Sequence, residues 1–159
     1  MIEAWLGERQ IRAVVFDLGT FANGGACHDG ALGTLETFRG TGVKMGLVTL
    51  ESSWWANHTL DHLGVREYFD YIGTVNGVNP FYGRIGSRDW GKAFAVLGVL
   101  PEKGIVVGSV LPGDIWEIGV KYRVRVLSER EMFDAKRRHE RTINVESISH
   151  VVTALLATV

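Results

Sequence analysis

The chain is short of the features that mark several large classes of protein. Its 159 residues include one cysteine, Cys27, so no disulfide can form within the chain and a reducing compartment is expected. The formal net charge of −1 gives no general attraction to nucleic acid or to an anionic membrane. No apolar run approaches the ~20 residues that span a bilayer, and the first residues lack the layout of a signal peptide. We therefore expect a cytoplasmic protein that binds neither nucleic acid nor membrane.

The composition is that of one folded domain. Apolar residues make up 46% of the chain and charged residues 22%, which argues against disorder. No repeat, low-complexity tract or linker divides the sequence. We expect a single domain over residues 1–159.

Short apolar runs alternate with helical patterns along the chain. The predicted strands cover 13–16, 43–48, 71–75, 105–107 and 123–127, and the predicted helices include 31–39, 87–97, 129–140 and a last one from 148 to 156. Residues 20–30 are rich in glycine and are predicted to form a loop. The first helix is expected to bury Leu32, Leu35 and Phe38. Such alternation predicts a parallel sheet with helices on both faces, a three-layer α/β/α sandwich.

Polar residues stand where the predicted strands end. Asp17 follows the apolar run 13–16, Thr49 follows the second strand, and Ser109 follows the fourth, with Asp114 five residues further on. In an open α/β sheet, groups at the carboxyl ends of the strands line the ligand crevice. We therefore expect Asp17, Thr49 and Ser109 to cluster at one edge of the sheet.

This order of motifs resembles the haloacid dehalogenase (HAD) superfamily. The resemblance runs from Ile11 to the last helix and includes the phrases Leu-Gly-Val-x-x-Tyr-Phe-Asp at 63–70 and Leu-Gly-Val-Leu-Pro-Glu at 97–102. It implies a HAD-like Rossmannoid sheet, and most members of the superfamily transfer phosphoryl groups through an aspartyl intermediate. Only residues 18–48 separate Asp17 from Thr49, and the segment before Arg84 is also short. The resemblance therefore implies a domain without the inserted cap.

The resemblance assigns roles to individual residues. Asp17 aligns with the nucleophile that attacks phosphorus and ligates Mg²⁺, and Thr49 aligns with the residue that hydrogen-bonds the phosphoryl group. Asp114 aligns with the last carboxylate of the fourth motif and is the second candidate metal ligand, beside the backbone carbonyl of Gly19. The third motif is a lysine usually followed by proline. Two positions remain open for it: Asn79 precedes a proline, whereas ungapped counting from 97–99 places Arg84 there.

The chain departs from the family pattern at two carboxylates. Where the phosphatases keep an aspartate as general acid and base, this chain has Gly19 or has lost the residue, and Ser109 stands where they keep an aspartate that ligates the metal. Loss of a general acid or base typically costs about 10²- to 10⁴-fold in rate, and hard cations need charged oxygens. We therefore predict weak Mg²⁺ binding and an eroded site, in a weak phosphatase or an inactive protein that binds a small phosphorylated molecule or a protein partner. The alternative is an active phosphatase that uses Asp17 as nucleophile and Arg84 for charge.

Two further groups of residues stand out. Trp54 and Trp55 follow the second strand, and neighbouring helical residues point about 100° apart, so at least one indole is predicted to be exposed and to form a contact surface. His58 and His62 have a spacing used for metal ligation, but an exposed helical face is the better interpretation. The basic run 136–141 is typical of segments that contact phosphate backbones, but it is interpreted as an exposed helical face as well.

Overall fold

A parallel six-stranded sheet forms the centre of the protein. The computed structural model describes residues 1–23, 26–74, 85–127 and 142–158. The strand order is β5-β4-β1-β6-β7-β8, and every neighbouring pair in this sheet is parallel. The strands are β1 (Ala13–Asp17), β4 (Lys44–Thr49), β5 (Tyr71–Thr74), β6 (Gly104–Gly108), β7 (Tyr122–Val126) and β8 (Thr142–Val145). The α/β architecture predicted from the alternation is confirmed.

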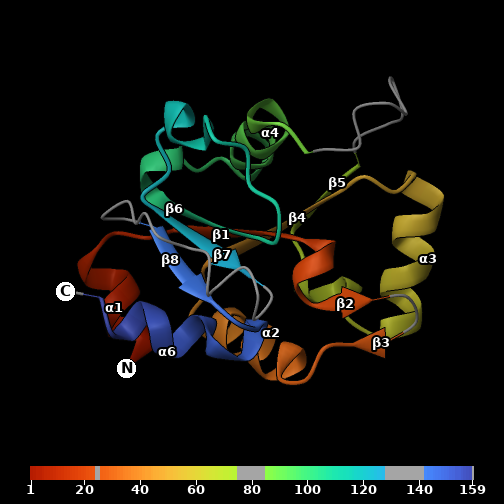
Figure 1. The fold of residues 1–159 in the computed structure, drawn as a ribbon, viewed down its shortest axis with the longest axis horizontal. Coiled ribbons are helices and arrows are strands. Elements are labelled where there is room, and N and C mark those ends of the chain that lie inside the picture. The colour runs from red at the N-terminus through yellow and green to blue at the C-terminus, as the bar shows by residue number, and fades with distance from the viewer. Residues whose placement is uncertain (24–25, 75–84, 128–141, 159) are drawn as a thin grey trace.

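Helices cover both faces of this sheet, as Figure 1 shows. Helix α4 lies on one face, and α1, α2 and α6 lie on the other. The helices are α1 (Ile2–Glu8), α2 (Ala31–Gly40), α3 (Ser53–Leu63), α4 (Ser87–Leu97) and α6 (Val151–Leu156). None of the helices in the described ranges is both long and apolar enough to cross a membrane.

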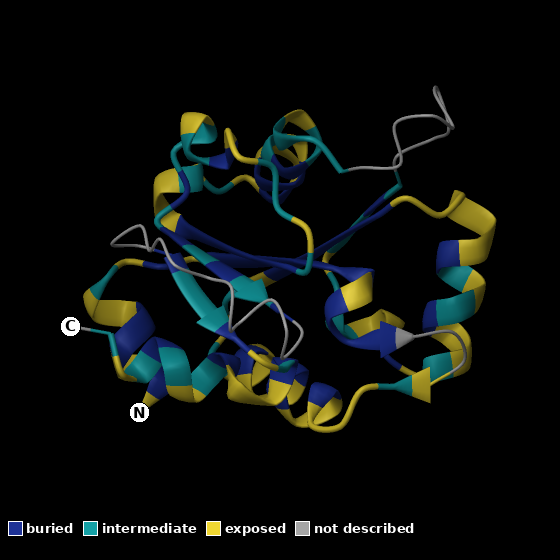
Figure 2. Cartoon of the chain, in the orientation of Figure 1, coloured by how far each residue is buried: buried dark blue, intermediate teal, exposed yellow. Residues whose placement is uncertain are grey.

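The central strand β1 packs against a hydrophobic cluster on each side. Val14 and Phe16 join the cluster beneath α2, where Phe38 meets the Phe16 ring edge-on. Val15 joins the cluster beneath α4, which contains Trp90 and other fully buried side chains. Burial on both faces is typical of parallel sheets and explains why β1 reads as a continuous apolar run. Figure 2 shows this buried centre and the exposed outer faces of the helices.

The connection from β1 to β4 contains no separate domain in its described residues 18–23 and 26–43. It consists of a 3₁₀ turn η1 (Leu18–Thr20), two short antiparallel strands β2 (Ala22–Asn23) and β3 (Ala26–Cys27), and then α2. The loop predicted over 20–30 is therefore wrong in part, because β2 pairs with β3 and the Phe21 ring is fully buried. That ring stacks on Phe69, 5.6 Å between centroids. Tertiary contact thus orders a segment whose glycines suggested a loop.

Three other details differ from the predictions. Helix α1 and the edge strand β8 were not predicted, although Ile2, Trp5 and Leu6 have helical spacing and are buried. In α2, Leu32 is 44% exposed, and Ala31 and Thr34 are buried beside Leu35 and Phe38 instead. The predicted helix over 129–140 and the basic run 136–141 lie outside the described residues.

Candidate functional site at the carboxyl ends of β4, β1 and β6

Three neighbouring strands end at the same edge of the sheet. Strand β1 lies between β4 and β6, and its last residue, Asp17, is paired in register with Val48. Strand β4 ends one residue later at Thr49, and β6 ends at Gly108, directly before Ser109. The predicted clustering of Asp17, Thr49 and Ser109 at one edge is therefore confirmed.

The carboxylate of Asp17 is held by hydrogen bonds from two loops. The Thr20 backbone N–H donates to Oδ1 at 3.0 Å, which closes the η1 turn. The Ser109 backbone N–H donates to Oδ2 at 2.9 Å, and the Ser109 hydroxyl donates to the same oxygen at 3.3 Å. Both carboxylate oxygens thus accept hydrogen bonds from neutral donors, and the carboxylate ties η1 to the loop that follows β6.

Burial dominates the electrostatics of Asp17. The residue is only 4% exposed, and this desolvation raises the pKa of its carboxyl group from 3.8 to about 6. The hydrogen bonds from Ser109, Thr20 and Val110 oppose this shift, because they favour the ionised form. The carboxyl group therefore changes its charge close to neutral pH.

Gly19 and Ser109 lie on either side of this carboxylate. A Cβ atom on Gly19 would stand 3.5 Å from Asp17 Oδ1 and 3.3 Å from Ser109 Oγ. The backbone of Gly19 does not adopt positive φ, so a side chain there would meet no left-handed strain. Residues 19 and 109, where the family pattern has carboxylates, thus converge on Asp17 in space.

Thr49 and Asp114 make other contacts. Thr49 is buried, and its Oγ1 accepts a hydrogen bond from the Glu51 backbone N–H at 3.2 Å. Asp114 is exposed, and its Oδ1 accepts from the Ser87 hydroxyl at 2.6 Å, at the first turn of α4. The N-cap residue of that helix is Gly86.

The described residues bring no metal-binding cluster together. Among residues 1–23, 26–74, 85–127 and 142–158, no group of three His, Cys, Asp or Glu side chains could hold a metal ion. Arg84 and Asn79, the two candidates for the third motif, both lie outside the described residues. Which of them takes that position stays open.

The two indoles at the start of α3 are both exposed. Trp54 is 65% exposed and Trp55 is 56% exposed, so the predicted exposure of at least one is confirmed. The Trp54 ring stacks on His58, with 5.1 Å between centroids, and meets Trp55 edge-on at 4.9 Å. His58 and His62 are exposed, as predicted.

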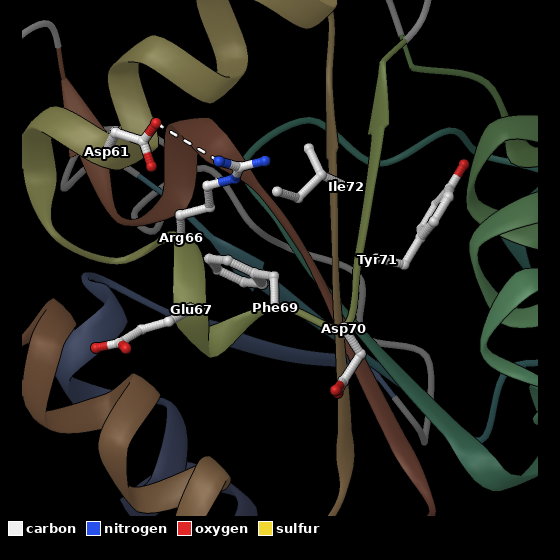
Figure 3. Close-up of a pocket in the computed structure, with 7 residues that line it drawn as sticks. All are labelled: Asp61, Arg66, Glu67, Phe69, Asp70, Tyr71 and Ile72. Carbon is white, nitrogen blue, oxygen red and sulfur yellow. Dashed lines mark ion pairs between the residues drawn. The ribbon is translucent and has the colours of Figure 1, made fainter.

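A pocket of about 400 Å³ lies away from this edge. Figure 3 shows it beside the start of β5, with the ion pair between Arg66 and Asp61 at 3.6 Å on its wall. The register pairs Tyr71 with Gly46 and Thr74 with Thr49, so the start of β5 is far from the carboxyl edge. The residues that line the pocket are Asp61, Arg66, Glu67, Phe69, Asp70, Tyr71 and Ile72.

The raised pKa of Asp17 predicts a specific dependence of stability on pH. Between about pH 4 and pH 6 the folded protein keeps a proton on Asp17 that the unfolded chain releases, so the free energy of unfolding falls as pH rises through this range. A shift of about two pKa units corresponds to about 3 kcal/mol. We expect urea unfolding of the wild type, compared with Asp17→Asn at each pH, to show this loss. Parallel pH profiles for the two proteins would contradict the prediction.

The fold is similar to that of several solved proteins. A protein of Thermotoga maritima assigned provisionally as a beta-phosphoglucomutase aligns with a TM-score of 0.73 and 13% identity over 94% of this chain and all of that one. A haloacid dehalogenase-like family hydrolase from Streptococcus pneumoniae aligns with a TM-score of 0.66 and 11% identity, over 91% of this chain and 98% of that one. A haloacid dehalogenase-like family hydrolase from Xanthomonas campestris aligns with a TM-score of 0.62 and 13% identity, over 84% of this chain and 51% of that one.

The sequence by itself gives no such match. No protein-family model and no curated protein matches the chain. At 11–13% identity, the structural similarity concerns the fold alone. The protein therefore has the α/β fold of haloacid dehalogenase-superfamily hydrolases, over most of its length.

Proposed function

We propose that this protein carries an eroded phosphoryl-transfer site and binds a phosphorylated molecule with weak hydrolysis or none. The observation that carries the proposal is the convergence of Gly19 and Ser109 on the buried carboxylate of Asp17. A phosphatase of this fold needs carboxylates at those positions for acid–base chemistry and for its metal. Here a hydrogen atom and a hydroxyl group occupy them, while the frame that holds Asp17 remains.

The donor set fits Mg²⁺ poorly. Asp17 and Asp114 would be the carboxylate ligands, with the Gly19 carbonyl beside them, and Mg²⁺ when bound would neutralise negative charge on a phosphate. However, both oxygens of Asp17 already accept hydrogen bonds, and Asp114 accepts one from Ser87. A hydroxyl group at Ser109 adds no charge to hold a hard cation. We therefore expect Mg²⁺ affinity in the millimolar range or weaker.

Charge repulsion limits what the site can do without a cation. Each charge of a phosphate dianion placed about 4 Å from ionised Asp17 costs on the order of 4 kcal/mol at an effective dielectric constant of 20. Protonation of Asp17 removes this repulsion and provides an O–H donor for a phosphate oxygen. The pKa near 6 means that mildly acid conditions supply this form. Binding of a phosphorylated ligand is therefore expected to strengthen as pH falls through 6.

The alternative is an active phosphatase with a rearranged catalytic set. In it, ionised Asp17 would attack phosphorus, Arg84 would offset the charge of the phosphoryl group, and Thr49 would hydrogen-bond one of its oxygens. The fixed position of Asp17 at the carboxyl edge, between the strands that carry Thr49 and Ser109, supports this possibility. The two proposals differ in whether Asp17 turns over substrate.

Exposed indoles extend the proposed binding surface. Helix α3 begins four residues after Thr49, so Trp54 and Trp55 follow the strand end at the same edge of the sheet as Asp17. Exposed aromatic groups commonly mark ligand or partner sites. We infer that these indoles contact the organic part of a phosphorylated aromatic ligand, whose phosphate lies towards Asp17.

A phosphatase assay separates the two proposals. We expect the wild type with Mg²⁺ to hydrolyse a panel of phosphate esters at a trace rate, and we expect Asp17→Asn to leave that rate unchanged. Asp29→Asn, an exposed acid on a loop, is the matched control for loss of one charge. Efficient turnover that Asp17→Asn abolishes and Asp29→Asn preserves would overturn the first proposal in favour of the active phosphatase.

A variant with carboxylates at both positions tests whether their absence accounts for the weak Mg²⁺ binding that we expect. The double variant Gly19→Asp/Ser109→Asp places two carboxylates against Asp17 without positive-φ strain, so calorimetry should show Mg²⁺ binding at least about tenfold tighter than in the wild type. The matched control is Gly19→Asn/Ser109→Asn, which has nearly the same shape without the charge and should gain no affinity. A folded Gly19→Asp/Ser109→Asp protein that binds Mg²⁺ no better than its control would mean that this edge was not a metal site.

The indole surface predicts a fluorescence response. Addition of 4-nitrophenyl phosphate at pH 5.5 should quench tryptophan emission of the wild type saturably. Trp54 and Trp55 are exposed, whereas Trp5 and Trp90 are buried and Trp116 is half-buried, so most of the quenching should come from the exposed pair. The variant Trp54→Ala/Trp55→Ala should lose most of this quenching and keep its melting temperature. Equal saturable quenching in both proteins would place the ligand elsewhere.

A further inference from the structure

A square of four polar side chains lies on β7 and β8. Residues 123 and 125 alternate with buried Tyr122 and Val124 along β7, so both arginines point to the same face of the sheet. The parallel register pairs Arg123 with Thr142 and Arg125 with Asn144. The guanidinium carbon of Arg123 lies 5.2 Å from the centre of the Trp116 ring, which packs against the cluster beneath α4. The square therefore faces the α4 side.

Several polar atoms of this square are buried without a hydrogen-bond partner. They are Arg123 Nε, Thr142 Oγ1 and Asn144 Oδ1, and the described residues contain only two other such side-chain atoms, both indole nitrogens. Buried polar groups are normally paired. Three unpaired atoms gathered on two adjacent strands indicate a site for a group that the described part of the chain does not supply.

Within the described residues, no acidic side chain forms an ion pair with the two arginines of this square. The ion pairs among the described residues join Arg9 to Glu8 and Arg66 to Asp61, and neither involves Arg123 or Arg125. Burial and the neighbouring charge of Arg125 lower the pKa of Arg123. Two half-buried guanidinium groups side by side favour a ligand of opposite charge.

This square is separate from the site at Asp17. Register places Asp17, Gly108 and Arg125 in one row across β1, β6 and β7, since Phe16 pairs with Val107 and Gly108 with Arg125. The Leu111 side chain covers Gly108, where its Cδ2 atom lies 2.5 Å from the position of a Cβ. None of the interactions that shift the pKa of Asp17 comes from an arginine. An apolar side chain thus stands between the carboxylate and the arginine pair.

We propose that Arg123, Arg125, Thr142 and Asn144 form an oxyanion-binding site, for a phosphate or a carboxylate group, on the α4 side of β7 and β8. The guanidinium fork matches the geometry of two oxygens on such a group. In the proposed complex the Thr142 hydroxyl donates a hydrogen bond to the anion. The Asn144 side chain rotates so that its Nδ2 group donates in place of the Oδ1 atom that is buried there in the free protein. The cation–π contact with Trp116 holds the Arg123 guanidinium group near this position before a ligand binds.

The test is an NMR titration of the full chain at constant ionic strength. Inorganic phosphate, and in a parallel arm acetate, is added while the Arg123 Nε–H resonance and the backbone amides of β7 and β8 are followed. We expect saturable shifts with phosphate, and Arg125→Gln should weaken the apparent affinity at least about tenfold. Arg12→Gln removes the same charge from an exposed position at the other end of β1 and should leave it unchanged. If acetate also gives saturable shifts, the site accepts carboxylate groups, which supports the proposal.

Two outcomes would overturn the proposal. One is the absence of a saturable shift at Arg123 with either anion. The other is an equal loss of affinity in Arg125→Gln and Arg12→Gln, which would mean a general response to charge. Asp17→Asn distinguishes the two sites, because it should leave phosphate binding at the arginines intact. If Arg125→Gln does not fold, Asn144→Leu is used in its place, and it should also weaken the apparent affinity for phosphate.

Discussion

The carboxylate at the end of β1 is the constraint on which the site depends. Asp17 ends a strand that is buried on both faces, so its charge has almost no access to water. The N–H groups of Thr20 and Ser109 compensate for part of this loss, and in doing so they fix the η1 turn and the loop after β6 against the strand end. The positions of Gly19 and Ser109 beside the carboxylate follow from these hydrogen bonds.

The same arrangement is the basis on which we propose binding rather than turnover at this site. Neutral donors stabilise a carboxylate without cancelling its charge, and burial raises its pKa to about 6. A phosphate dianion approaching such a group meets repulsion that a metal would relieve, and the neighbouring side chains provide few charged ligands for one. The fold is shared with haloacid dehalogenase-like hydrolases, but the chemistry of this edge is set by what surrounds Asp17.

The sheet holds opposite charges two strands apart. Asp17 on β1 and Arg125 on β7 lie in the same row, and Leu111 fills the space above Gly108 between them. Because an apolar side chain separates them, neither charge neutralises the other. The proposed ligands of the two sites therefore differ in charge: we propose an anion at the arginines, whereas Asp17 takes up a proton.

Local pattern in the sequence determined most of the fold, because apolar runs with helical or strand periodicity encode their own burial. It located Asp17, Thr49 and Ser109 at strand ends, and parallel strands bring such ends together. The tertiary structure alone decided the rest. Strand β8 alternates polar with apolar residues in only four positions, so its register beside Arg123 and Arg125 could not be predicted. Likewise, Asp114 accepts a hydrogen bond from the hydroxyl of Ser87, 27 residues away, and no local pattern encodes a contact between segments so far apart.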